Sequence, residues 1–250
     1  LEWSYFTAAL GVFSILYGAL EAMAQTDFKK LVAYSSISHM GYVVLGLSAM
    51  NLADGAGYYA YGVNGAMYMM LAHGVTSAAM FFLVGVIYDR AHTRDLDALG
   101  GLNGPMPLYG ALSYVVFFGS MGLPGLCGFV AEVFVVLAAF HYSVTMGVLA
   151  AAAVVLTAGY LLWTIQRVYL GRNETWKDLP DLSPVEIGVA APLVALTVLL
   201  GVFPHQLVLG WMSPSVERMV AGVTQGTTAA VATPMADATP EVPPVAADLR

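Results

Sequence analysis

Long apolar segments alternate with short polar ones along the chain. Six of these segments are apolar over roughly 20 residues or more, the length that a helix needs to cross a bilayer. They cover residues 5–23, 31–50, 62–88, 106–140, 144–169 and 187–211. The pattern predicts an all-α fold, a polytopic membrane helical bundle of about six transmembrane helices that forms a transmembrane domain over residues 1–212.

The apolar segment 106–140 differs from the others in length. It is too long for one straight crossing and short for two with a turn. Gly122, Pro124 and Gly125 lie in its middle, where proline removes a backbone donor and glycine loosens a helix. We predict one crossing broken into two half-helices near Leu123, an arrangement that often marks ion sites in transporters. A kink without function and a hairpin of two short helices are the alternatives.

The composition indicates that lipid is the solvent of this chain. Hydrophobic residues make up 59% of the sequence and charged residues 10%, whereas a soluble domain carries about 25% charged residues. The formal net charge is −7 and no basic stripe is present, which excludes nucleic-acid binding on electrostatic grounds. Cys127 is the single cysteine, so we predict neither an intrachain disulfide nor a thiolate metal site. Met67, Met69 and Met70 are interpreted as packing residues rather than metal ligands.

The distribution of lysine and arginine predicts the orientation of the chain in the membrane. Of the nine basic residues, seven fall at or beside three alternate loops between the predicted spans. These seven are Lys29, Lys30, Arg90, Arg94, Arg167, Arg172 and Lys177. Because cytoplasmic loops carry an excess of basic residues, we expect these loops in the cytoplasm and both termini on the non-cytoplasmic side.

The two ends of the chain carry further expectations. Residues 213–250 are rich in proline, alanine, threonine and acidic residues, so they are predicted to be a largely disordered tail beyond about Val223. The chain opens with Leu1 rather than methionine and runs directly into an apolar segment. We therefore expect it to be a piece of a longer protein.

One carboxyl group lies deep in the apolar sequence. Glu132 follows Pro124 by eight residues, in the second half of the broken segment, with apolar neighbours on both sides. A charged side chain at bilayer depth costs at least ~2.5–3.5 kcal/mol, so such residues face a partner or water. We interpret Glu132 as a protonatable group on a proton path. A structural carboxyl group that is hydrogen-bonded to a neighbouring helix is the alternative.

Two histidines lie near the middle of predicted spans. Ser35 precedes His39 by four residues, and Thr76 and Ser77 follow His73 by three and four, so each imidazole shares a helix face with hydroxyl groups. Histidine titrates near neutral pH, and hydroxyl groups can order water, which together favour a proton relay through His39 and His73. Hydrogen bonding between helices is the alternative role.

Four motifs resemble the antiporter-like membrane subunits of respiratory complex I, over about residues 24–171. Mrp-type cation/proton antiporters share all but one of them. The shared motifs are AQTDFKKLVAYSSISHMGY at 24–42, MLAHG at 70–74, and GLPG at 122–125 followed by FVAE at 129–132. The stretch HTRDLDALGGL at 92–102 is more particular and is similar to the subunit M type of NADH:quinone oxidoreductase.

The resemblance implies a proton-translocating subunit that takes no part in the redox chemistry of its complex. In this family the chain would supply the last six of about fourteen helices, with Glu132 as the charged proton-path residue on a broken helix. The remaining charged proton-path residues of the family would precede Leu1, so this piece would not pump alone. NADH, FMN, iron–sulfur clusters and quinone would bind partner subunits, and no cofactor is expected in this chain.

The same resemblance implies a multi-pass protein of the bacterial inner (plasma) membrane, assembled with the other membrane subunits of complex I. A subunit of an Mrp-type sodium/proton antiporter, which is a secondary transporter, is one alternative. A purely structural or assembly subunit that kept the fold without transport is another. The combined motifs favour the proton-translocating subunit of complex I, and the other two functions remain alternatives.

Overall fold

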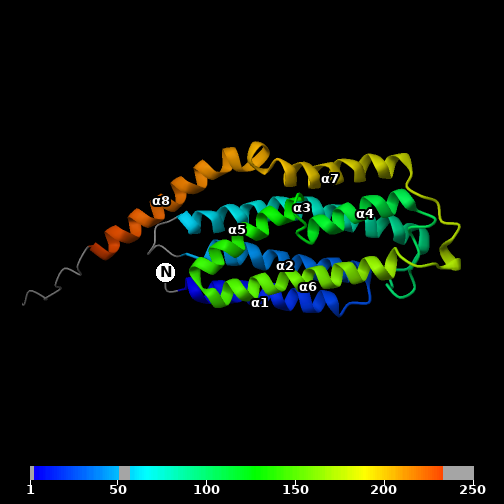
Figure 1. Ribbon diagram of the computed structural model, residues 1–250, viewed down its shortest axis with the longest axis horizontal. Helices are drawn as coiled ribbons and strands as arrows, with labels where there is room; N and C mark the ends of the chain where they lie inside the picture. Colours follow the sequence, from blue (N-terminus) through cyan, green and yellow to red (C-terminus); the bar gives the residue numbers. More distant parts are fainter. Residues whose placement is uncertain (1–2, 51–56, 233–250) are drawn as a thin grey trace, which may run out of the picture.

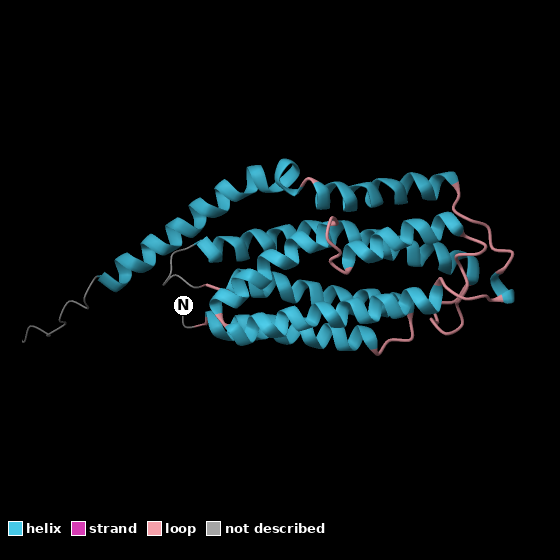
Figure 2. Cartoon of the chain, viewed as in Figure 1, coloured by secondary structure: helices cyan, strands magenta, loops and turns pink. Residues whose placement is uncertain are grey.

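The computed structural model describes residues 3–50 and 57–232, with side chains up to residue 225, and these residues form an elongated bundle of helices (Figure 1). Figure 2 shows helices joined by loops, without a strand in the described residues. The helices are α1 Ser4–Met23, α2 Phe28–Ser48, α3 Gly57–Ala91, α4 Pro107–Ser120, α5 Cys127–Tyr142, α6 Val144–Val168, the 3-10 helix η1 Glu174–Trp176, α7 Pro184–Val202, the π-helix η2 His205–Leu209 and α8 Gly210–Ala232.

The helices have the lengths that a membrane requires. Five of them, α1, α2, α3, α6 and α7, are long and apolar enough to cross a bilayer. The shorter apolar helices α4 and α5 follow one another along the bundle and together cover its length (Figure 1). The predicted membrane bundle of about six spans, one of them broken, is confirmed.

Glycines allow the first three helices to approach closely. A Cβ atom on Gly41 of α2 would lie 2.7 Å from the backbone nitrogen of Ile15 on α1. A Cβ atom on Gly62 of α3 would lie 2.7 Å from the carbonyl oxygen of Gly46 on α2. Membrane helices pack through such small residues. The close packing fixes the relative positions of the side chains that α2 and α3 point toward each other.

The predicted helix break is confirmed. Residues 121–126 are irregular chain between α4 and α5, halfway along the bundle (Figure 2). Gly122 and Gly125 have φ angles of 76° and 92°, a left-handed conformation that glycine adopts readily, and Pro124 supplies no backbone donor. Helix α7 covers this segment so closely that a Cβ atom on Gly201 would overlap its backbone.

The last predicted span is shorter than the sequence suggested. We predicted one crossing over residues 187–211, whereas α7 ends at Val202. Pro204 follows, and a proline cannot donate the backbone hydrogen bond that would continue the helix. After η2 the chain continues as α8, which leaves the bundle at an angle (Figure 1).

The tail also differs from the prediction. We predicted disorder beyond about Val223, whereas helix α8 continues to Ala232, and residues 233–250 lie outside the described part of the chain. Met212, Val216 and Val220 recur every four residues on this helix and are all buried. This apolar face packs α8 against the bundle, which stabilises the helix despite its content of threonine and glycine.

The loops with the basic residues lie at one end of the bundle, which we call the basic end. All seven residues predicted to share a side of the membrane lie there. Backbone hydrogen bonds join the loops: the nitrogen of Phe28 donates to the oxygen of Arg94 at 2.8 Å, and that of Gly101 to the oxygen of Leu170 at 2.9 Å.

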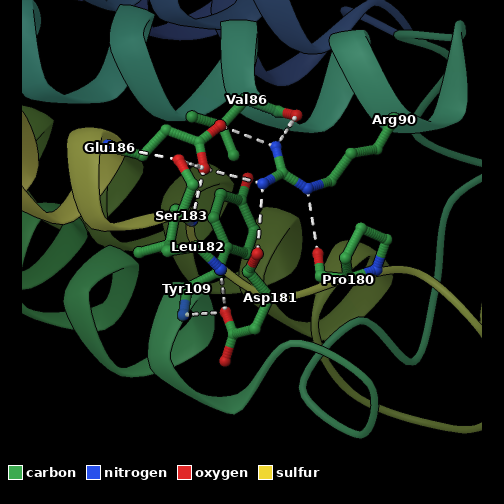
Figure 3. Close-up of polar contacts among 8 residues, drawn as sticks. All are labelled: Val86, Arg90, Tyr109, Pro180, Asp181, Leu182, Ser183 and Glu186. Carbon is green, nitrogen blue, oxygen red and sulfur yellow. Dashed lines mark hydrogen bonds and ion pairs between the residues drawn. The ribbon is translucent and has the colours of Figure 1, made fainter.

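Arg90 joins the end of α3 to the start of α7 at the basic end (Figure 3). Its two terminal nitrogens donate to the two carboxylate oxygens of Glu186 at 2.8 and 2.7 Å. The same guanidinium donates to the carbonyl oxygens of Val86, Pro180 and Asp181 at 3.0, 2.9 and 3.1 Å. Bidentate pairs of this kind are strong and directional. Arg90 therefore acts as a clamp between two helices, beyond the topological role that the sequence indicated.

The neighbouring carboxylate extends this clamp to the broken span. Asp181 accepts hydrogen bonds from the backbone nitrogens of Leu108 and Tyr109 at 2.8 and 3.0 Å, in the first turn of α4, and Figure 3 shows the contact with Tyr109. The first backbone donors of a helix have no partner within the helix, and a carboxylate there is favourable. Asp181, which lies just before α7 in the sequence, therefore connects the start of α4 to Arg90 and to α7.

Candidate functional site

Two imidazole rings meet inside the bundle. His39 on α2 and His73 on α3 are both buried, and their ring centroids lie 4.9 Å apart with an angle of 22° between the planes. The sequence placed each of them near the middle of a span but could not place them together. The structure brings the two predicted histidines into direct contact.

His39 is held between two backbone carbonyl groups. Its Nδ1 lies 2.7 Å from the carbonyl oxygen of Ser35, and its Nε2 lies 2.9 Å from that of Ser120. A neutral imidazole carries one N–H group, whereas the protonated ring carries two. The neutral ring therefore donates to one of these oxygens and the protonated ring to both. The hydrogen bonds of this site change with the protonation state of His39.

The carbonyl group of Ser120 belongs to the helix break. Ser120 is the last residue of α4, where carbonyl oxygens lack a partner within the helix and carry a partial negative charge. The Nε2 contact of His39 gives this oxygen a hydrogen-bond partner. The break thus supplies a contact to the histidine pair from a residue 81 positions away in the sequence.

The hydroxyl groups predicted beside the imidazoles bond to the backbone of their own helices. Ser35 donates from its hydroxyl group to the carbonyl oxygen three residues earlier at 2.8 Å, and Thr76 donates to the one four residues earlier at 3.1 Å. Ser and Thr in membrane helices often bond to their own backbone in this way. Ser77 is half-buried on the same helix. The described hydrogen bonds of Ser35 and Thr76 therefore run along their own helices rather than to the imidazole rings.

Glu132 lies on α5 with its carboxyl group against the helix break. The residue is 4% exposed, so it faces the interior of the bundle rather than the surrounding lipid. The carboxyl oxygens lie so close to Gly122 that a Cβ atom on that glycine would overlap them. Gly122 is also left-handed, with a φ of 76°. The left-handed backbone favours glycine at this position, and a larger residue would also displace the carboxyl group beside it.

The break borders both candidate groups. Ser120 contacts His39, and Gly122, two residues further along the same segment, contacts Glu132. The end of α4 therefore lies next to His39, and the start of the irregular chain lies next to the carboxyl group of Glu132. Two of the residues that the sequence proposed for a proton path, His39 and Glu132, thus lie beside the break, and His73 stacks on His39.

Several buried polar atoms near these residues have no hydrogen-bond partner in the described part of the chain. They include Nδ1 of His73 and the hydroxyl groups of Ser120 and Tyr160. Tyr160 lies on α6, is fully buried, and stands within electrostatic range of Glu132. Sequence reasoning missed it, because a single tyrosine in an apolar helix has the signature of a packing residue. The only available signal was the spacing of polar residues, because Thr157 precedes Tyr160 by three positions and Thr164 follows it by four, which puts all three on one helix face.

The described residues do not contain a group of three or more His, Cys, Asp or Glu side chains placed to hold a metal ion. Cys127 is a buried free thiol at the start of α5. An acid, two imidazoles and several hydroxyl groups, all of which can form hydrogen bonds, lie around the break.

The sequences of related proteins match most of this chain. NADH-quinone oxidoreductase subunit M of Rhodobacter capsulatus is 43% identical over 217 residues, which are 86% of this chain and 41% of that protein. F(420)H(2) dehydrogenase subunit M of Methanosarcina mazei is 40% identical over 213 residues, 85% of this chain and 41% of that protein. The chain thus spans less than half the length of these relatives.

Solved structures show the same fold. Respiratory complex I from Thermus thermophilus contains a chain with a TM-score of 0.79 and 30% identity, which matches 90% of this chain and 45% of that one. The Mrp complex from Dietzia sp. DQ12-45-1b contains one with a TM-score of 0.75 and 20% identity, which matches 89% and 48%. The family model described as NADH:quinone oxidoreductase/Mrp antiporter, transmembrane, matches residues 1–157. With its broken span, its buried carboxyl group and this match, the chain belongs to the transmembrane family of NADH:quinone oxidoreductase and Mrp antiporter subunits.

Proposed function

We propose that this chain is the proton-conducting C-terminal part of a subunit M of NADH:quinone oxidoreductase, complex I. In this proposal it moves protons across the membrane while other subunits transfer electrons from NADH to quinone. The relatives named subunit M support the assignment, since one of them is 43% identical over 86% of this chain. The observation that carries it is Glu132, a buried carboxyl group beside a helix break that also contacts a buried histidine pair.

The proposed path uses exchange of one proton between the groups at the break. Glu132 accepts a proton and becomes neutral, which removes a buried charge. His39 holds a proton by donating to Ser120 or Ser35, and it can donate to both when it carries two. His73, stacked on His39, is the next acceptor in this path. Each group gains or loses only a proton, so this part of the complex needs no cofactor of its own.

Water is the proposed carrier between these groups. Buried polar atoms in proteins are normally hydrogen-bonded, either to protein or to ordered water. Three polar atoms near the break have no partner among the described residues, namely His73 Nδ1, Ser120 Oγ and Tyr160 Oη. Their positions support a hydrated region that reaches from the histidine pair toward the carboxyl group.

The remaining parts of the proposal concern the surroundings of the chain. NADH, FMN, iron–sulfur clusters and quinone are assigned to partner subunits, and the other membrane subunits of complex I are the proposed neighbours. The basic end is assigned to the cytoplasmic side of a bacterial inner membrane because it carries seven of the nine lysines and arginines. This orientation puts both termini on the non-cytoplasmic side.

Purification of the assembly that contains the full-length protein tests the assignment. An affinity tag on the protein is expected to co-purify FMN, iron–sulfur clusters and NADH:quinone activity. Sodium/proton exchange in reconstituted vesicles, without flavin or iron in the preparation, would instead identify an Mrp-type antiporter. An assembly with NADH:quinone activity whose proton pumping does not depend on this subunit would identify a structural role.

A further inference from the structure

A groove at the basic end lies apart from the proton path. It has a volume of about 330 Å³ and lies between the start of α2 and the end of α3. Its walls combine two cationic side chains with an apolar and aromatic surface: Lys29, Phe81, Val84, Gly85, Tyr88 and Arg94. The volume falls in the range of ligand sites in proteins.

The backbone places the two cations beside each other. The loop after α3 pairs with the segment before α2, because the nitrogen of Phe28 donates to the oxygen of Arg94 at 2.8 Å and that of Leu96 to the oxygen of Thr26 at 2.8 Å. Lys29 is the next residue after Phe28. The HTRDLD stretch, which the proton path does not use, therefore serves to fix Arg94 next to Lys29 at the rim of the groove.

Both cations keep donors for a ligand. Lys29 is exposed and has no ion-pair partner among the described residues. Arg94 faces one oxygen of Asp27 through Nε at 3.5 Å, while the other oxygen of Asp27 accepts the backbone N–H of Lys30. The guanidinium carbon of Arg94 lies 5.3 Å from the ring centroid of Tyr88, a cation–π contact that orients the group. The terminal nitrogens of Arg94 and the ammonium of Lys29 have no hydrogen-bond acceptor among the described residues.

The floor of the groove is apolar and has a notch. A Cβ atom on Gly85 would meet no atom within 4 Å, so this position is open. Phe81, one helical turn closer to the middle of the bundle, is 37% exposed, and Val84 is buried beside it. A hydrocarbon chain laid along α3 would pass over the open glycine and contact the phenylalanine ring.

We propose that this groove binds a phospholipid with an anionic headgroup. The lipid phosphate contacts Lys29 and Arg94, and an acyl chain lies over Gly85 against Phe81. Basic pockets between membrane helices at the cytoplasmic surface suit such headgroups. The apolar floor distinguishes a lipid from free phosphate, which would gain nothing from Phe81. The position at the end of two membrane-spanning helices puts the cations at headgroup depth.

Lipid titrations of the full-length protein in its assembled complex test the proposal. The complex is kept in a neutral detergent, and bound lipid is counted by native mass spectrometry with phosphatidylglycerol, phosphatidylcholine and inorganic phosphate as separate probes. Two variants address the site, Lys29→Gln with Arg94→Gln for charge and Gly85→Leu for space. Two variants serve as controls, Lys177→Gln at the basic end and Gly188→Leu, whose Cβ position on α7 is equally open.

We expect phosphatidylglycerol to bind in preference to phosphatidylcholine. Affinity should fall about fivefold for each cation removed, because each lysine or arginine near an anionic headgroup contributes about 1 kcal/mol of binding free energy. Gly85→Leu should also abolish retention of the lipid, although both cations remain. Both control variants should bind as the wild type does.

Three results would overturn the proposal. The first is equal retention of phosphatidylglycerol and phosphatidylcholine by the wild type. The second is wild-type affinity in the Gly85→Leu variant, which folds without strain because leucine is a better helix former than glycine. The third is displacement of phosphatidylglycerol by millimolar inorganic phosphate, which would identify a simple anion site. None of these results depends on whether the chain conducts protons.

Discussion

The contribution of the Arg90–Glu186 clamp to the free energy of unfolding follows from its burial and its geometry. The two side chains are only 12% and 19% exposed, and two hydrogen bonds of 2.7 and 2.8 Å join them. Replacing Arg90 with methionine leaves the carboxylate of Glu186 without its cation. Loss of one partner of a buried pair costs ~3–5 kcal/mol. The partial exposure of this pair lowers our expectation to about 2–3 kcal/mol in the free energy of unfolding.

A double-mutant cycle isolates the pair itself. Arg90→Met, Glu186→Gln and the double variant are made in the full-length protein, and the free energy of unfolding is measured by denaturant titration in lipid micelles. We expect a coupling energy of about 1.5–2 kcal/mol. The control is the pair of Lys177 and Glu174, 3.7 Å apart with side chains 61% and 86% exposed. Exposed pairs give ~0.2–1 kcal/mol, so this control should stay at the low end of that range.

The outcome that contradicts the clamp is a coupling energy no larger than that of the exposed control. Equal coupling would mean that solvent screens both pairs alike. The burial of the pair would then add nothing measurable to the interaction between Arg90 and Glu186.

Three further substitutions probe the helix break and the residues beside it. Gly122→Ala adds a Cβ atom where the carboxyl group of Glu132 lies and costs roughly 1–2 kcal/mol of backbone strain, so proton pumping should fall in reconstituted vesicles. The control Gly125→Ala carries the same kind of strain into open space, and equal pumping by both variants would contradict the contact. His39→Phe removes both carbonyl contacts of the ring, so proton pumping in a vesicle assay should slow at least tenfold. His39→Gln keeps a hydrogen-bond donor and should retain more activity. Equal pumping rates in the two variants would exclude a role for His39 as a donor. Tyr160→Phe removes a hydroxyl group without a hydrogen-bond partner among the described residues, so the free energy of unfolding should change by less than about 0.5 kcal/mol. Proton pumping should slow in the same variant. A large loss of stability with normal pumping would show that Tyr160 is a packing residue.

Local signals in the sequence were enough to find the break. Gly122, Pro124 and Gly125 interrupt an apolar segment, and each acts on the backbone at its own position. Glu132 was equally visible as a carboxyl group among apolar neighbours. Features of this kind depend on one residue and its immediate surroundings, so periodicity and residue chemistry predict them.

Contacts between distant parts of the chain could not be predicted in the same way. His39 and Ser120 are 81 residues apart, and Arg90 and Glu186 are 96 apart. Nothing in the sequence near His39 indicates which carbonyl group its Nε2 will meet, because the register between helices sets that contact. The sequence therefore proposed the histidines as members of a path without their partners, and it assigned Arg90 only a role in topology.

Composition placed the start of the disordered tail too early. Residues 213–250 are rich in proline as a whole, so we predicted disorder beyond about Val223, but the prolines after Pro214 begin only at Pro234. Helix α8 accordingly continues to Ala232, just before the first of these prolines. The position of the next proline was a better guide to the end of α8 than the average composition of the tail.

The most direct test of the proton path is the ratio of protons pumped to electrons transferred in vesicles that contain the assembled complex with Glu132→Gln. Glutamine keeps the shape of the side chain but has no carboxyl group that can take up and release a proton. We predict that pumping falls at least severalfold while NADH oxidation with an artificial electron acceptor stays near the wild-type rate, and that the exposed control Glu174→Gln changes neither. An unchanged ratio of protons to electrons in Glu132→Gln would contradict the claim that protons pass through the carboxyl group beside the helix break.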